Sequence, residues 1–198
     1  MADETEPLED DFGEIEILKG HSYERLQFEL NNIKSESPEG IAITIKDDDL
    51  FRWRVIIQGP EGTPYEGGKF SLKLYFPSGY PEYPPLLCFK TKIFHPNVDS
   101  FGIVHVEILL PTNWSPTMSV SDVLRTVQDV LVCPKPSEYC DPVIIHRYQQ
   151  DKEQFIDQAK EWTNKYAIHQ SSSTGILQRL KCISNVSCCR KQNSYAAD

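Results

Sequence analysis

Residues 95–116 have the sequence HPNVDSFGIVHVEILLPTNWSP. They belong to a proline-rich stretch, residues 77–117, with prolines at positions 77, 81, 84, 85, 96, 111 and 116. Proline fixes the φ angle and has no backbone N–H donor, so we expect little regular structure here. Long irregular segments inside a compact domain are uncommon and usually functional. We therefore expect the functional site in this stretch.

The residues before this stretch predict one helix and four strands. Helical spacing of Tyr23, Leu26, Leu30 and Ile33 predicts a helix over about residues 22–35. Alternation of apolar residues predicts strands over 41–45, 51–57 and 70–76, and a short apolar run predicts a fourth over 86–89. Turn-forming Asp, Gly and Pro residues separate them. This order predicts a four-stranded antiparallel meander after the helix.

The residues after the stretch predict helices. Ser119 or Ser121 is suited to cap a helix that ends at Pro134. Two more helices are expected over about residues 142–149 and 151–167. The fold class is therefore α+β, with an N-terminal helix, a four-stranded antiparallel meander and C-terminal helices in one core domain over residues 22–167.

The two ends of the chain differ in composition from this core. Residues 1–16 contain eight acidic and no basic residues, so we expect residues 1–21 to be an unstructured leader, either solubilising or interacting. Residues 168–198 are polar and serine-rich and are expected to form a flexible tail. The segment Cys188-Cys189-Arg190-Lys191 is either ordinary tail or a site of reversible acylation.

Charge and cysteine content exclude several classes of function. The net charge of −9 disfavours nonspecific binding to nucleic acid or anionic membranes. No apolar run approaches the roughly 18 residues of a membrane span, and the acidic start does not resemble a signal peptide. The six cysteines lack zinc-type spacing with the histidines, so we expect reduced thiols, no metal or cofactor, and a cytoplasmic or nuclear location.

The order of motifs along the chain resembles the catalytic core of ubiquitin-conjugating enzymes. The resemblance covers residues 22–167 and rests on several motifs in the same order as in the family: Pro64-Tyr65-x-Gly67-Gly68, Tyr80-Pro81-x-x-Pro84-Pro85, His95-Pro96-Asn97, Trp114-Ser115-Pro116 and Glu161-Trp162-Thr163-Asn164-Lys165-Tyr166-Ala167. It implies the fold of that family and its chemistry, in which a cysteine carries the modifier as a thioester and passes it to an amine.

The resemblance also implies where the reacting residues belong. The cysteine of the family lies eight residues after the asparagine of His-Pro-Asn, and here that position holds His105. Asn97 is the equivalent of the asparagine that stabilises the oxyanion or orders the loop. Glu138 occupies the place of the acidic residue that assists the attacking amine, or is a solvated loop carboxylate. His105 fills a vacated position, keeps a residual acyl-transfer or general-base role, or contacts a partner.

The partners implied by the resemblance are ubiquitin or a ubiquitin-like protein, a ubiquitin ligase, or an active conjugating enzyme. Residues at the family's partner-binding positions are Glu82, Trp114, Ser115, Pro116, Thr117 and Arg25. Those in the loops are alternatively explained by turn chemistry. Glu82 replaces an aromatic or aliphatic residue that contacts RING-type ligases, which weakens that contact. Arg25 is the one basic residue on the exposed face expected for the first helix, so steering toward an acidic partner should be weak.

Because an imidazole replaces the thiol, we expect a non-catalytic variant of a ubiquitin-conjugating enzyme. Such a domain binds modifier, ligase or active conjugating enzyme without carrying the modifier itself. The alternative is an active enzyme that uses another cysteine, which retention of Asn97, Glu138 and Trp114-Ser115-Pro116 favours.

Overall fold

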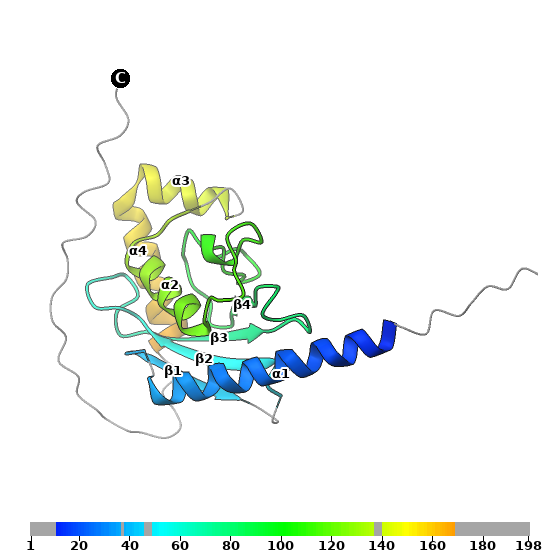
Figure 1. The fold of residues 1–198 in the computed structure, drawn as a ribbon. Coiled ribbons are helices and arrows are strands. Elements are labelled where there is room, and N and C mark those ends of the chain that lie inside the picture. The colour runs from blue at the N-terminus through cyan, green and yellow to red at the C-terminus, as the bar shows by residue number, and fades with distance from the viewer. Residues whose placement is uncertain (1–10, 37, 46–48, 137–139, 169–198) are drawn as a thin grey trace, which may run out of the picture.

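The computed structural model describes residues 11–36, 38–45, 49–136 and 140–168. The chain forms a four-stranded sheet, and Figure 1 shows helices packed against this sheet and at its ends. The elements are α1 (Asp11–Ser35), β1 (Ile41–Ile45), β2 (Arg52–Gln58), β3 (Lys69–Tyr75), β4 (Leu86–Phe89), the 3₁₀ turn η1 (Glu107–Leu109), α2 (Val120–Val132), α3 (Pro142–Gln150), α4 (Lys152–Thr163) and the π-helical turn η2 (Asn164–Ile168). The predicted α+β fold is confirmed.

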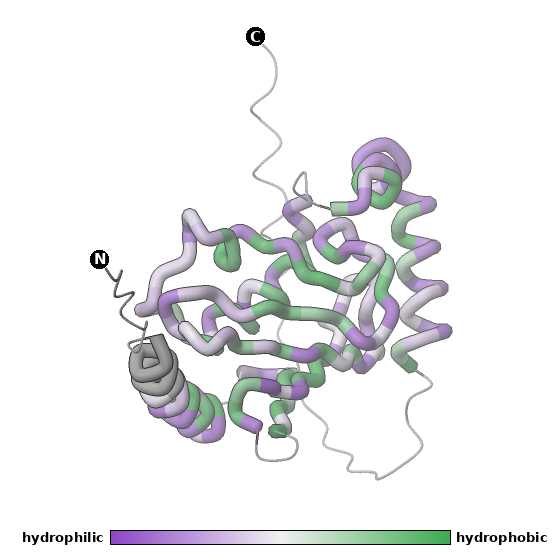
Figure 2. The backbone as a smooth tube through the Cα atoms, turned by 90° about the vertical axis from the view of Figure 1, so that its right-hand side faces the viewer, coloured by the Kyte–Doolittle hydropathy of each residue, from purple (hydrophilic) through white to green (hydrophobic). Residues whose placement is uncertain are grey.

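The sheet is an antiparallel meander with the strand order β1-β2-β3-β4. Trp53 pairs with Leu74, and Val55 pairs with Leu72. These four side chains lie on one face and are buried, as the alternating sequence predicts. In Figure 2 the apolar segments gather at the centre of the body, whereas the helices at its margin alternate between polar and apolar residues. All four predicted strands are confirmed to within one residue at each end.

Helix α2 buries one face against the sheet, including Val123, Leu124, Val127 and Leu131. Of the two serines suited to cap it, Ser119 does so: its hydroxyl accepts a hydrogen bond from the N–H of Asp122, whose carboxylate accepts from the N–H of Ser119. Hydrogen bonds from the Ser119 side chain and backbone lower the pKa of Asp122. This reciprocal cap fixes where the irregular stretch ends and α2 begins.

Helix α1 begins at Asp11, eleven residues before the predicted start at residue 22. The prediction that residues 11–21 belong to an unstructured leader is therefore wrong, and residues 1–10 lie outside the described residues. Acidic residues, which suggested a disordered segment, are also favoured at the amino end of a helix because they complement its dipole.

The predicted C-terminal helices are present as α3, α4 and η2. Asp141 caps α3 by accepting a hydrogen bond from the N–H of Val143. The helices are joined to the irregular stretch by ring contacts of Phe94, whose centroid lies 5.6 Å from that of Phe155 and 5.5 Å from that of Trp162. The tail predicted over 168–198 lies outside the described residues, except for Ile168.

Candidate functional site

The segment 98–104 forms a tight turn against the outer edge of β4. The N–H of Phe89 donates to the carbonyl of Gly102, and the N–H of Val104 donates to the carbonyl of Leu87. Isolated bridges join Cys88 to Ile103 and Val98 to Val104. The turn therefore takes the place of a fifth strand and delivers residue 105 to the surface just beyond it.

Gly102 is required in this turn for two reasons. Its φ angle is +86°, which side-chain-bearing residues rarely adopt. A Cβ atom at this position would also overlap the carbonyl oxygen of Phe89. The backbone of the turn and that of β4 thus approach each other as closely as glycine allows.

Gly102→Ala is expected to lower the free energy of unfolding by about 2–4 kcal/mol, because φ strain and steric overlap add. Gly67→Ala is the matched control, since Gly67 has a φ of +77° but open space around its Cβ position. The control should lose only about 1–2 kcal/mol. Urea unfolding of both variants tests this, and equal losses would show that the approach to Phe89 is not a constraint.

His95 anchors the start of the segment in the core. Its Nε2 lies 2.9 Å from the carbonyl oxygen of Val130 in α2, and its Nδ1 accepts a hydrogen bond of 2.9 Å from the N–H of Asn97. Because Nδ1 is an acceptor, Nε2 carries the proton and donates to Val130. Complete burial lowers the pKa of His95 to about 4, against a smaller opposing effect of the Val130 hydrogen bond. His95 is therefore a neutral structural residue.

Asn97 uses its whole side-chain amide to hold backbone segments together. Its Nδ2 donates to the carbonyls of His105 at 2.9 Å and Lys135 at 2.6 Å, and its Oδ1 accepts from the N–H of Lys135 at 2.9 Å. The residue is buried. Of the two roles that the resemblance implies for Asn97, the observed contacts are those of loop ordering.

His105 lies half-buried beside the turn, and Asp99 fixes its ring. The Nε2 of His105 is 3.0 Å from Oδ2 of Asp99. The other carboxylate oxygen, Oδ1, accepts hydrogen bonds from the N–H groups of Phe101 and Ile103. One carboxylate thus orders both the backbone turn and the imidazole.

Burial raises the pKa of the Asp99 carboxyl, but hydrogen bonds from His105 and from the N–H groups of Ile103 and Phe101 outweigh it and hold the pKa below its usual value. Asp99 is therefore ionised at neutral pH and acts as a hydrogen-bond acceptor for the imidazole N–H. The sequence analysis did not identify Asp99, because no sequence motif contains it. Its hydrogen bonds form only when the turn brings His105 and the N–H groups of Phe101 and Ile103 close to its carboxylate.

A groove of about 340 Å³ runs past His105. The residues that line it are mostly apolar and come from three segments of the chain. These are Pro84 to Leu87, Ile103 to Leu110 with the exception of Ile108, and Lys135 with Pro136. The described residues include three cysteines, Cys88, Cys133 and Cys140. None of these three lines the groove. Glu138 lies outside the described residues, so its position relative to His105 stays a prediction.

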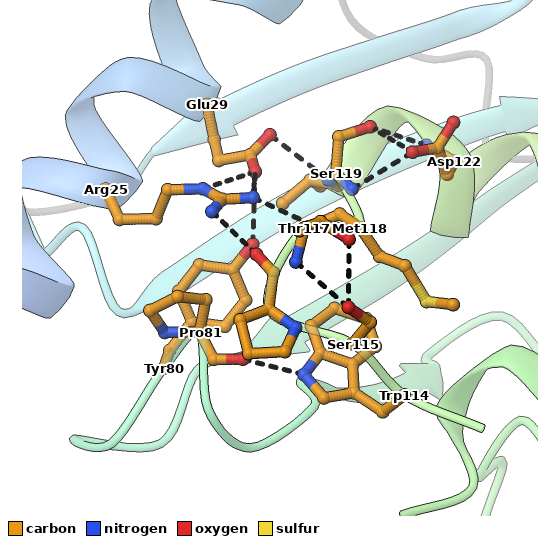
Figure 3. Close-up of polar contacts among 12 residues, drawn as sticks. Arg25, Glu29, Tyr80, Pro81, Trp114, Ser115, Thr117, Met118, Ser119 and Asp122 are labelled. Atoms are coloured by element: carbon orange, nitrogen blue, oxygen red, sulfur yellow. Dashed lines mark hydrogen bonds and ion pairs between the residues drawn. The ribbon is translucent and has the colours of Figure 1, made fainter.

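The predicted partner-binding residues Arg25, Trp114, Ser115 and Thr117 lie together at the junction of α1 with two loops (Figure 3). Pro116 belongs to the same group, because its carbonyl accepts a hydrogen bond from Arg25. The indole N–H of Trp114 donates to the carbonyl of Pro81 at 2.7 Å, which joins loop 76–85 to loop 110–119. The hydroxyl groups of Ser115 and Thr117 lie 2.9 Å apart. Glu82 is exposed on the first of these loops.

Arg25 differs from the expectation that it is displayed to a partner. Its side chain is only 24% exposed and pairs with the buried carboxylate of Glu29 at 2.7 Å. It also donates to the carbonyls of Pro116 and Met118, both at 2.8 Å. Arg25 thus stabilises the loop from inside and is less exposed than predicted, whereas its role as a partner contact stays a prediction.

Glu29, which sequence reasoning missed, is the centre of this network (Figure 3). It accepts hydrogen bonds from Arg25, from the hydroxyl of Tyr80 at 3.2 Å and from the N–H of Val120 at 3.1 Å. Burial, and then the negative charge of Glu29, raise the pKa of Tyr80. An acidic residue four positions after Arg25 on a helix was the available signal.

Comparison with known protein families identifies the family of this domain. Residues 25–163 match the family model of ubiquitin-conjugating enzymes. The chain belongs to the ubiquitin-conjugating enzyme family. The match contains the whole sheet, the irregular stretch, α2, α3 and α4, so the predicted family is confirmed.

Members of the ubiquitin-conjugating enzyme family interact with ubiquitin and with ligases. In this member the described helices are too short or too polar to span a bilayer. In the same part of the chain, no three His, Cys, Asp or Glu side chains are grouped closely enough to bind a metal ion.

Proposed function

We propose that this chain is a non-catalytic member of the ubiquitin-conjugating enzyme family, which binds ubiquitin or a ubiquitin-like protein, a ligase, or an active conjugating enzyme. The observation that carries the proposal is His105, which stands where the family has its cysteine and is held by Asp99 beside the groove. An acyl-imidazole hydrolyses readily, so an imidazole there is a poor carrier for a modifier.

The contacts around His105 support a domain in which the loops around position 105 stay ordered although the thiol is missing. Asn97 still joins residue 105 to the loop at Lys135, as three hydrogen bonds show. Trp114 still ties the two loops together. A binding function needs this rigid surface but does not need a thiol.

Location in the cytoplasm or nucleus stays a prediction.

The alternative is an active enzyme that uses another cysteine. Of the described cysteines, Cys88 in β4 contacts the turn, with its Sγ 3.4 Å from the carbonyl oxygen of Phe101. Its side chain is buried in β4 and does not line the groove. A thiol must be accessible to exchange a thioester, and none of the three described cysteines lines the groove beside His105, so the proposal favours the binding role.

Restoring the thiol tests whether only the nucleophile is missing. His105→Cys is expected to form an adduct with ubiquitin that reducing agent removes, because the turn and the Asn97 contacts are in place. Wild type, His105→Ala and His105→Cys are incubated with activating enzyme, ATP and ubiquitin and run on a non-reducing gel. Wild type and His105→Ala should show no adduct.

Two results would change this account. An adduct on wild type that survives His105→Ala but disappears when Cys88, Cys133 or Cys140 is replaced would establish the alternative. A His105→Cys variant that stays inert would show that docking of the activating enzyme is lost as well as the nucleophile.

A further inference from the structure

The outer face of the sheet is the face that points away from the core. Its side chains come from alternate positions of the four strands, and their neighbours along each strand face the core. They are Ala42, Thr44, Arg52, Arg54, Ile56, Gln58, Lys69, Ser71, Lys73, Tyr75, Leu86 and Cys88. Four of these side chains are basic and none is acidic, although the whole chain has a net charge of −9.

Two of the basic side chains, Arg54 of β2 and Lys73 of β3, lie directly opposite each other on this face. The N–H of Phe76 donates to the carbonyl of Phe51, which makes these two residues a hydrogen-bonded pair. Such pairs alternate with non-hydrogen-bonded pairs in an antiparallel ladder. Since Arg54 and Lys73 lie three positions further along an unbroken register, they form a non-hydrogen-bonded pair, in which side chains approach each other most closely.

These two cations have no balancing anion in the part of the chain that the structure describes. Like charges directly opposite each other lower the stability of a sheet. Arg52 at the margin of the outer face is 3.3 Å from the carboxylate of Asp49, but no described carboxylate forms an ion pair with Arg54, Lys69 or Lys73. Arg54 is exposed and Lys73 is partly exposed, so an anion can reach both.

We propose that the outer face of the sheet binds an acidic segment of a partner protein, whose carboxylates contact Arg54 and Lys73. Charge complementarity supports this occupant, because an anion between the two cations offsets the repulsion that they exert in the free chain. Ile56, two positions after Arg54, is exposed on the same face and provides an apolar contact. None of the basic residues on this face lines the groove beside His105, so this surface is separate from that groove.

The charge and spacing of the outer face favour a polypeptide over a nucleic acid or a membrane. The net charge of −9 repels a long polyanion or an anionic bilayer. A short acidic segment is subject mainly to the local charges, since salt screens exposed charges that lie more than about 10 Å away. Side chains on one face of a strand repeat every two residues, about 7 Å, and an extended peptide with acidic and apolar side chains has the same repeat.

A substitution that stabilises the fold and removes the proposed contact provides the test. Arg54→Glu places opposite charges across the strand pair, so the midpoint of urea unfolding should rise. The same change should weaken binding of an acidic segment, because it puts a carboxylate where the partner's carboxylate would lie. Lys152→Glu, at the exposed first residue of α4, is the matched control with the same change of charge.

The probe is a fluorescein-labelled peptide of four Glu-Glu-Val repeats, and the same peptide with Gln in place of Glu is the neutral control. Fluorescence anisotropy with the full chain at about 50 mM salt should show binding of the acidic peptide and none of the neutral one. Arg54→Glu should weaken binding at least about tenfold, whereas Lys152→Glu should change it less than about twofold. Raising the salt to about 0.5 M should weaken binding to wild type as well.

Equal binding of the acidic and the neutral peptide would overturn the proposal, as would binding that Arg54→Glu leaves unchanged or a lower urea midpoint for that variant. Tighter binding of a uridine oligonucleotide of equal charge would assign the outer face to RNA instead. Binding that appears only when the five carboxylates of residues 1–10 are replaced by amides would assign it to the chain's own acidic residues. None of these results depends on whether the chain carries a modifier.

Discussion

Replacing Glu29 with alanine is expected to lower the free energy of unfolding by about 3–5 kcal/mol. Glu29 is 1% exposed and accepts hydrogen bonds from Arg25, Tyr80 and Val120. Its removal leaves the Arg25 guanidinium without its counterion and the Tyr80 hydroxyl and Val120 N–H without an acceptor. Loss of one partner of a buried ion pair is costly because the other charge remains desolvated.

The loss should be visible as a lower midpoint in urea unfolding followed by tryptophan fluorescence. Arg52→Ala is the matched control, since Arg52 pairs with Asp49 at 3.3 Å on the surface and is 74% exposed. That change should cost less than about 1 kcal/mol. Similar losses for the two variants would show that the α1 network does not hold the two loops in place.

The second large effect is a loss of stability between pH 6.5 and pH 5 that His95 causes. The pKa of His95 is about 4 in the folded chain, whereas an unfolded histidine has a pKa of about 6.5. Between these values the unfolded chain binds more protons, so the free energy of unfolding falls as the pH falls. The contribution of His95 is fully present above pH 6.5 and should fall by about 2 kcal/mol by pH 5.

Urea unfolding at half-unit pH intervals measures this slope. His95→Gln is the appropriate variant, because its amide can still donate to the Val130 carbonyl but cannot titrate. Asp99 and Asp122, whose pKa values are lowered, contribute only at more acidic pH, near and below the unfolded value of about 4. A slope that persists unchanged in His95→Gln would mean that other groups cause it.

Local patterns were sufficient to predict most of the fold. The alternation in β2 and β3 and the apolar face of α2 specify these elements, because each buries one face against the same core. The start of α1 was missed because Asp11 to Leu18 is rich in carboxylates and the composition was interpreted as disorder. Composition alone does not separate a disordered acidic segment from the acidic amino end of a helix.

The candidate site could be predicted only in part. Family spacing located His105 and Asn97, but the contact of His105 with Asp99 depends on the path of the turn through Gly102. Likewise, the hydrogen bond from Val120 to Glu29 joins residues 91 positions apart. Contacts of this kind arise from tertiary packing, which no local pattern encodes. Arg25 was assigned to the surface for the same reason.

The central claim is that the chain does not carry a modifier through a thioester. Its most direct test is the intact mass of the wild-type chain after incubation with activating enzyme, ATP and ubiquitin, measured with and without reducing agent. The account predicts the unmodified mass of 22.7 kDa under both conditions. A mass increased by one ubiquitin that returns to the unmodified value on reduction would contradict it.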